Sequence, residues 1–104
     1  MVKKITIEVP DEIGHYAKDV GYFMESMLRK LYLNRHKGFA EGVTVSKATE
    51  LLDGEVIELK DALLFKGQFD AFFEAVDVAN MALLTGLVTT RLTRNEYDKG
   101  RDKK

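Results

Sequence analysis

The stretch from Phe69 to Val88, FDAFFEAVDVANMALLTGLV, limits what this chain can fold into. It is mostly apolar and long enough to be taken for a membrane span. It also contains Asp70, Glu74 and Asp77, and it has no basic residue. Each acid near the centre of a membrane span costs about 2.5–3.5 kcal/mol on insertion. We therefore expect no membrane contact, and a helix buried in protein that carries acids on an apolar surface.

The rest of the chain predicts an all-α fold, an antiparallel bundle of three long helices. Apolar residues recur at helical spacing over 13–31, and Gly38 lies where a C-terminal cap belongs. A second helix is predicted over 46–67, with Ser46 as its N-cap, and a third over about 68–86. Residues 87–97 predict a final short helix, although Val88, Thr89 and Thr90 are poor helix formers.

Composition and charge limit the classes of protein to which this sequence can belong. The 104 residues predict a single domain, with 1–9 as an N-terminal arm or short strand and 98–104 as a flexible basic tail. The net charge of −1 argues against nucleic acid as a partner. The absence of Cys excludes disulfide scaffolds, thiolate metal sites and cysteine nucleophiles. No secretory leader pattern opens the chain, so we expect a cytoplasmic protein.

Two pairs of acids, each three residues apart, interrupt apolar helix faces. Glu55 breaks the apolar stripe of the second helix, and Glu58 follows one turn later. Glu74 and Asp77 lie in the apolar third helix, and none of the four has a Lys or Arg three or four residues away. Carboxylates that face one another repel unless a cation lies between them, and Mg²⁺ or Mn²⁺ takes oxygen ligands. The same pattern also fits a solvent-exposed polar stripe without metal.

The order of these motifs resembles a known family. Residues 55–63, EVIELKDAL, and residues 74–80, EAVDVAN, are similar to the E-x-x-E … E-x-x-D signature of the MazG-like nucleotide pyrophosphohydrolases. This family belongs to the all-α NTP pyrophosphatase superfamily. Residues 34–39, NRHKGF, resemble the Asn-x-His-Lys-Gly segment that precedes the signature in small relatives. The resemblance covers about residues 23–86, and Gly54 stands where many relatives carry an additional acid.

The resemblance implies an activity and a set of residues. The chain would be a nucleoside triphosphate pyrophosphohydrolase, which hydrolyses (d)NTP to (d)NMP and pyrophosphate and cleanses the nucleotide pool. Its cofactor would be Mg²⁺, with Mn²⁺ as a substitute. The metal ligands would be Glu55, Glu58, Glu74 and Asp77. Glu58 would also be the general base that takes a proton from the attacking water.

Three further residues are candidates for substrate binding. His36 and Lys37 could contact phosphate or base, although cations at a helix end also fit ordinary capping of the helix dipole. Asn80 could orient a ligand or an Asp77 oxygen, and a plain buried amide would be equally well satisfied.

Two readings compete with the enzyme. The opening KITIEVPDE of residues 4–12 looks like the start of a ribbon-helix-helix DNA-binding or antitoxin module, and a catalytically silent helical scaffold would show the same acids. For all three we expect a homodimer or homotetramer. The third helix is apolar around most of its circumference, and two neighbours in one short chain cover only part of it.

Overall fold

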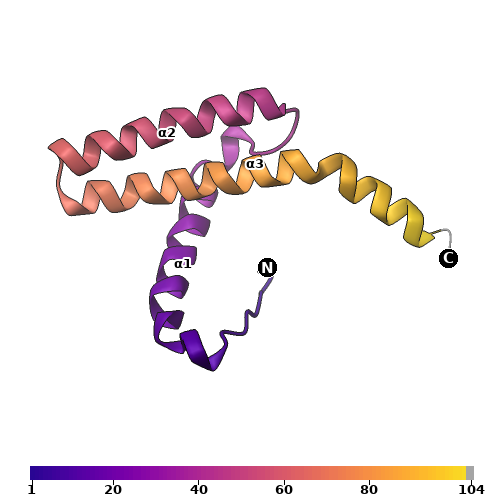
Figure 1. Cartoon of the computed structure of the whole chain (residues 1–104), viewed down its shortest axis with the longest axis horizontal. Helices are drawn as coiled ribbons and strands as arrows, with labels where there is room; N and C mark the ends of the chain where they lie inside the picture. Colours follow the sequence, from indigo (N-terminus) through magenta and orange to yellow (C-terminus); the bar gives the residue numbers. More distant parts are fainter. Residues whose placement is uncertain (103–104) are drawn as a thin grey trace.

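The computed structural model describes the backbone of residues 1–102 and the side chains of residues 1–90. All regular elements in this part of the chain are helical, which confirms the predicted all-α class. Figure 1 shows three long helices, and two short 3₁₀ turns accompany them. In chain order the elements are η1 (Asp11–Tyr16), α1 (Ala17–Leu33), η2 (Arg35–Lys37), α2 (Val45–Phe65) and α3 (Gln68–Asp102).

The centre of the fold is an antiparallel hairpin of α2 and α3 (Figure 1). Only Lys66 and Gly67 connect the two helices, so they must lie side by side. The N-cap of α2 is Thr44 rather than the predicted Ser46, because Thr44 has an extended backbone and its Oγ1 accepts from the amide of Lys47 at 3.1 Å.

One stripe of α3 supplies most of the core. Val76, Asn80, Leu84 and Val88 follow one another at four-residue spacing, and all four are buried. Leu84 and Val88 pack with Ala48 near the start of α2, and Phe39, Ala40 and Val43 of the preceding loop cover this cluster. Gly38 and Gly42 let the loop turn back onto the helices, since both have a φ of 73°.

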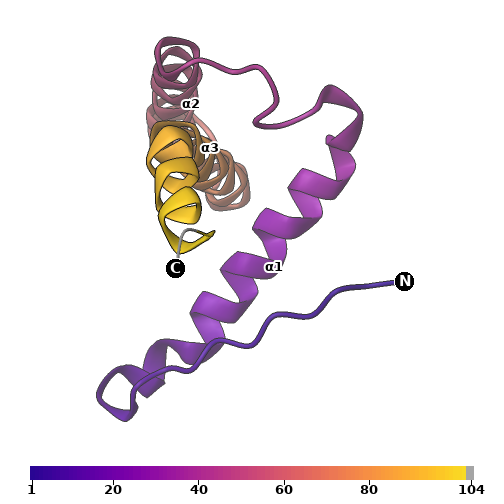
Figure 2. The same ribbon diagram turned by 90° about the vertical axis from the view of Figure 1, so that its right-hand side faces the viewer.

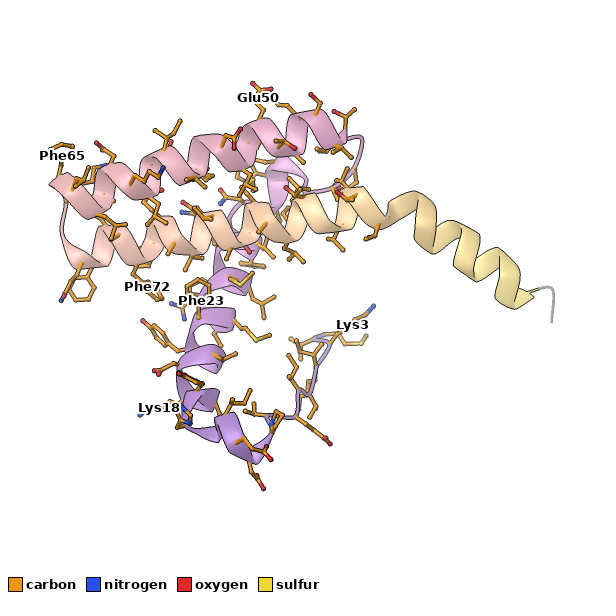
Figure 3. All side chains as sticks on the ribbon, in the orientation of Figure 1. Lys3, Lys18, Phe23, Glu50, Phe65 and Phe72 are labelled. Atoms are coloured by element: carbon orange, nitrogen blue, oxygen red, sulfur yellow. The ribbon has the colours of Figure 1, made fainter. Side chains whose placement is uncertain are left out.

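Helix α1 lies across the hairpin rather than along it, so the predicted bundle of three antiparallel helices is wrong for this element (Figures 1 and 2). Within the described residues it packs on α3 and not on α2, and it has no buried residue. Aromatic rings contribute to this contact: Phe23 and Phe72 meet edge to face, with ring centroids 5.7 Å apart (Figure 3). Periodicity shows which face of a helix is apolar but not the angle at which two faces cross.

The chain ends also depart from the predictions. Residues 1–10 form neither strand nor helix (Figure 2), and no other segment of the described residues forms a strand that could pair with them. The predicted fourth helix, 87–97, instead continues α3 without a break. The hydroxyl of Thr90 is satisfied within the helix, since it donates to the carbonyl oxygen of Gly86 at 3.0 Å. Residues 98–102, predicted as tail, are helical as well, and 103–104 lie outside the described residues.

Much apolar surface is left uncovered. The chain exposes 8819 Å², whereas a compact protein of 11.8 kDa exposes about 5900 Å². Segment Gln68–Thr90 of α3 is long and apolar enough to span a membrane by length and composition, and 22% of its most apolar window is buried. Phe65 and Phe69, on either side of the hairpin turn, are 79% and 73% exposed. Both rings thus lie exposed near the closed end of the hairpin.

Candidate metal centre

The spacing of the acids places them opposite one another across the hairpin. Glu58 and Glu74 each lie eight residues from Lys66 at the turn, and Glu55 and Asp77 each lie eleven residues from it. In an antiparallel helix pair, residues equally distant from the turn come to the same level. The two motifs therefore form one layer between α2 and α3.

Three carboxylates of this layer meet. Glu55, Glu58 and Glu74 each offer an oxygen, and these oxygens all lie within 4.8 Å of one another. Two oxygens on opposite sides of a Mg²⁺ ion are about 4.2 Å apart, since each bond is 2.0–2.1 Å long. The cluster of Glu55, Glu58 and Glu74 therefore offers the donor atoms that a hard divalent cation requires, at separations within 4.8 Å.

Two oxygens in the cluster are buried without a partner. Oε2 of Glu55 and Oε2 of Glu74 are shielded from solvent, and neither has a hydrogen-bond donor. A buried carboxylate oxygen without a donor is unfavourable, because it has lost its water and gained nothing in exchange. A cation between the three carboxylates would supply the missing interaction, so these residues fit a metal ion.

The pKa values of the metal-free chain also show that the carboxylates lack a positive charge beside them. Burial, together with the negative charges of Glu58 and Asp77, raises the pKa of Glu55 to about 7. Burial and the charge of Asp77 also raise the pKa of Glu74, and Lys66 partly offsets this. Near neutral pH the protein thus retains a proton at Glu55 that an ordinary surface glutamate would have lost.

Asp77, the fourth predicted ligand, lies beside the cluster and has a different partner. Its Oδ1 is 3.4 Å from Nζ of Lys30 in α1. The Asp77 side chain is 19% exposed and that of Lys30 is 41% exposed, so water screens this ion pair only in part. Sequence analysis missed Lys30, because the two residues are 47 positions apart and no local pattern connects α1 with the middle of α3.

Asn80 is the other buried polar residue of this region. It is 3% exposed, and its Nδ2 donates to the carbonyl oxygen of Met27 in α1 at 3.2 Å. Its Oδ1 has no hydrogen-bond partner. The amide is therefore half satisfied, and one acceptor remains for a ligand.

A groove of about 780 Å³ opens beside Glu55 of the carboxylate cluster. Its lining includes three cationic side chains, Lys30, Arg35 and Lys37, together with Asn80 and three acids, Glu41, Glu55 and Asp77. A smaller hollow of about 410 Å³ also adjoins the cluster and is lined by Glu58, Asp61, Lys66 and Glu74, together with Ile57. Glu58 and Glu74 of the cluster thus line the hollow, and Glu55 lines the groove.

The candidate substrate residues differ in their placement. Lys37 and Asn80 line the groove, whereas His36, in the same short turn η2 as Lys37, is exposed and is not among the lining residues. Arg35 lines the groove, and its guanidinium also lies 4.0 Å from the ring centroid of Tyr32. The sequence signal for Arg35 was its place in the NRHKGF segment, next to the two predicted cations.

Comparison of the chain with family models, with curated proteins and with solved structures found no match.

Proposed function

We propose that this chain is a Mg²⁺-dependent nucleoside triphosphate pyrophosphohydrolase of the MazG-like kind, which converts (d)NTP to (d)NMP and pyrophosphate. One observation carries the proposal: three carboxylates from two adjacent helices meet beside a groove whose lining includes three cationic side chains, and two of the carboxylate oxygens are buried without a partner. A divalent cation complements the three carboxylates, and a polyphosphate complements the cationic side chains of the groove. Its physiological role would be the removal of unwanted nucleotides from the cytoplasmic pool.

Glu55, Glu58 and Glu74 would hold the metal, and Asp77 would join them once its pair with Lys30 is given up. When bound, Mg²⁺ neutralises phosphate charge and lowers the pKa of a nearby water. Mn²⁺ would substitute, because it accepts the same oxygen ligands.

The protein's own groups would direct the hydrolysis. The oxygen of a water attacks the α-phosphorus, the bond from this phosphorus to the α–β bridging oxygen breaks, and pyrophosphate leaves with the bond electrons. Glu58 takes the proton of the water, since it is the most exposed carboxylate of the cluster and faces the smaller hollow. Lys37 holds phosphate oxygens, and the free Oδ1 of Asn80 accepts from a donor on the nucleoside. His36 reaches the ligand only if η2 turns toward the groove.

The active form would be a homodimer or homotetramer. The chain exposes about 2900 Å² more than a compact protein of its mass, in part because the end of α3 projects beyond the hairpin (Figure 1). Stable homodimers bury about 1000–2500 Å² on each chain, which this excess can supply. A second copy on the face around Phe65 and Phe69 would remove the largest exposed rings from water.

Metal-dependent release of pyrophosphate tests the proposal. The protein is incubated with a panel of NTPs and dNTPs, with Mg²⁺ or with a chelator, and pyrophosphate is measured. Release that requires the metal supports the enzyme. No release from any nucleotide favours the silent scaffold, and a salt-dependent shift of DNA favours the ribbon-helix-helix reading.

A further inference from the structure

Lys30 connects the candidate metal centre with the groove. Its ammonium lies 3.4 Å from the Asp77 carboxylate, and its side chain also lines the groove with Arg35 and Lys37. It comes from α1, whereas the metal cluster belongs entirely to α2 and α3. Among the described residues, this is the ion pair that links α1 to the hairpin.

We propose that Lys30 exchanges partners when the site fills: it pairs with Asp77 in the metal-free chain, yields this carboxylate to the metal, and then binds a phosphate oxygen of the ligand in the groove. The inference rests on the proposed metal centre. It assigns to Lys30 a role as a positioning residue for the polyphosphate, which neither the motif nor its spacing indicates.

The exchange follows from competition between two cations for one carboxylate. Asp77 is opposite Glu55 in the layer of acids, so its charge contributes to the site whether or not it touches the ion. A divalent cation held by the cluster repels an ammonium at Asp77 and attracts the carboxylate toward itself. Lys30 can leave at little cost, because its pair with Asp77 is 3.4 Å long and partly exposed.

The released ammonium has a new partner at hand. A lysine head is a compact charge on a flexible stem, and it can reorient without any movement of the backbone. The wall where Lys30 lies already carries Arg35 and Lys37, so a polyphosphate in the groove would meet three cations there. Because Lys30 belongs to α1, the exchange would also hold α1 against the bound ligand.

The test compares Lys30→Gln with two matched controls in the full-length protein. Lys37→Gln removes a charge from the same wall, and Lys47→Gln removes the exposed pair with Glu50, which is 3.7 Å long and lies on α2. Mg²⁺ affinity and the affinity for inorganic tripolyphosphate at saturating Mg²⁺ are measured by calorimetry. Thermal unfolding is followed with and without the metal.

The two affinities of Lys30→Gln should move in opposite directions. Mg²⁺ should bind about two- to fivefold more tightly, because no ammonium competes for Asp77. Tripolyphosphate should bind about tenfold more weakly, because a charged donor is lost. Lys37→Gln should weaken tripolyphosphate with a much smaller effect on Mg²⁺, and Lys47→Gln should change neither. Lys30→Arg, which keeps the charge, should restore tripolyphosphate binding.

A parallel loss of both affinities in Lys30→Gln, or unchanged values, would overturn the exchange. If Lys30→Gln does not fold, the NMR resonance of the Lys30 ammonium is followed in the wild-type protein instead. This resonance should shift when Mg²⁺ is added and again when tripolyphosphate is added. A resonance that shifts with neither refutes the proposal. A wild-type protein that binds no Mg²⁺ refutes the metal centre itself. Mg²⁺ binding without any effect of Lys30→Gln refutes the exchange alone.

Discussion

The side-chain amide of Asn80 fastens α1 to α3 through a 3.2 Å hydrogen bond to the carbonyl oxygen of Met27. The two residues are 53 positions apart, and Asn80 interrupts an apolar stripe in which Val76 and Leu84 are its neighbours one turn away. A buried amide at this position is stable only while Met27 is near, so the bond fixes where α1 crosses the hairpin.

Asn80→Asp should therefore destabilise the protein by about 1–3 kcal/mol. The change removes the donor to Met27 and adds a negative charge next to Asp77. Asn34→Asp is the matched control, because Asn34 also donates from Nδ2 over 3.2 Å, but to Lys30 within α1. Urea unfolding measures both variants, and equal losses would show that the Asn80 bond has no special role in holding α1.

Without metal, the stability should depend on pH through Glu55. The unfolded carboxyl titrates near 4.5 and the folded one near 7, so the folded chain holds the extra proton between these values. The free energy of unfolding should then fall as pH rises from about 4.5 to about 7, and level off above, by about 1–2 kcal/mol in this partly exposed site. Urea unfolding at several pH values, with a chelator present to remove metal, measures this free energy. Glu55→Gln should flatten the curve, and an equally steep curve in this variant contradicts the assignment.

Metal binding should release a proton near neutral pH. Glu55 is about half protonated at pH 7, and a carboxylate must be deprotonated to bind Mg²⁺. Titration calorimetry in two buffers of different ionisation enthalpy gives the number of protons released. We expect the release of about 0.5 proton per bound ion at pH 7, and of almost none above about pH 8.5. A value independent of pH would place the ion away from Glu55.

Glu58→Gln should abolish pyrophosphate release, with a loss of about 10²–10⁴ in rate. Glu58 offers an oxygen to the metal cluster and is the proposed base. Asp61→Asn is the control: Asp61 lies one turn later on α2 and lines the same hollow, but it is outside the cluster. It should keep most of the activity. Similar losses in the two variants would point to general charge effects rather than to a role of Glu58.

The oligomer can be tested on the exposed rings near the hairpin turn. Light scattering should give about 24 or 47 kDa, two or four times the chain mass of 11.8 kDa, and a mass near 12 kDa would refute the assembly. Phe69→Asp should shift the protein toward monomers, because a charge replaces a ring that is 73% exposed in the isolated chain. Val45→Asp, at the exposed start of α2, should leave the mass unchanged.

The hairpin could be predicted from the sequence because its determinants are local. Helical periodicity marks α2 and α3, and the equal distances of Glu58 and Glu74 from Lys66 place the acids at one level. The crossing of α1 depends instead on single contacts between distant residues, Asn80 with Met27 and Lys30 with Asp77. Such pairs leave no periodic signal, so both the groove and the partner of Asp77 became visible only in three dimensions.

Helix α1 is attached to α3 and not to α2, and this affects how the chain folds and how it opens locally. The α2–α3 hairpin is closed by a two-residue turn, so its contacts are short in sequence and can form early in folding. Helix α1 has no buried residue, so we expect it to open as a separate unit before the hairpin does. Glu55, Glu58 and Glu74 would stay together on α2 and α3 during this opening. The groove would be lost, because Lys30, Arg35 and Lys37 would move away from the hairpin. The proposed cation site and the proposed anion site would thus belong to two parts of the protein that differ in stability.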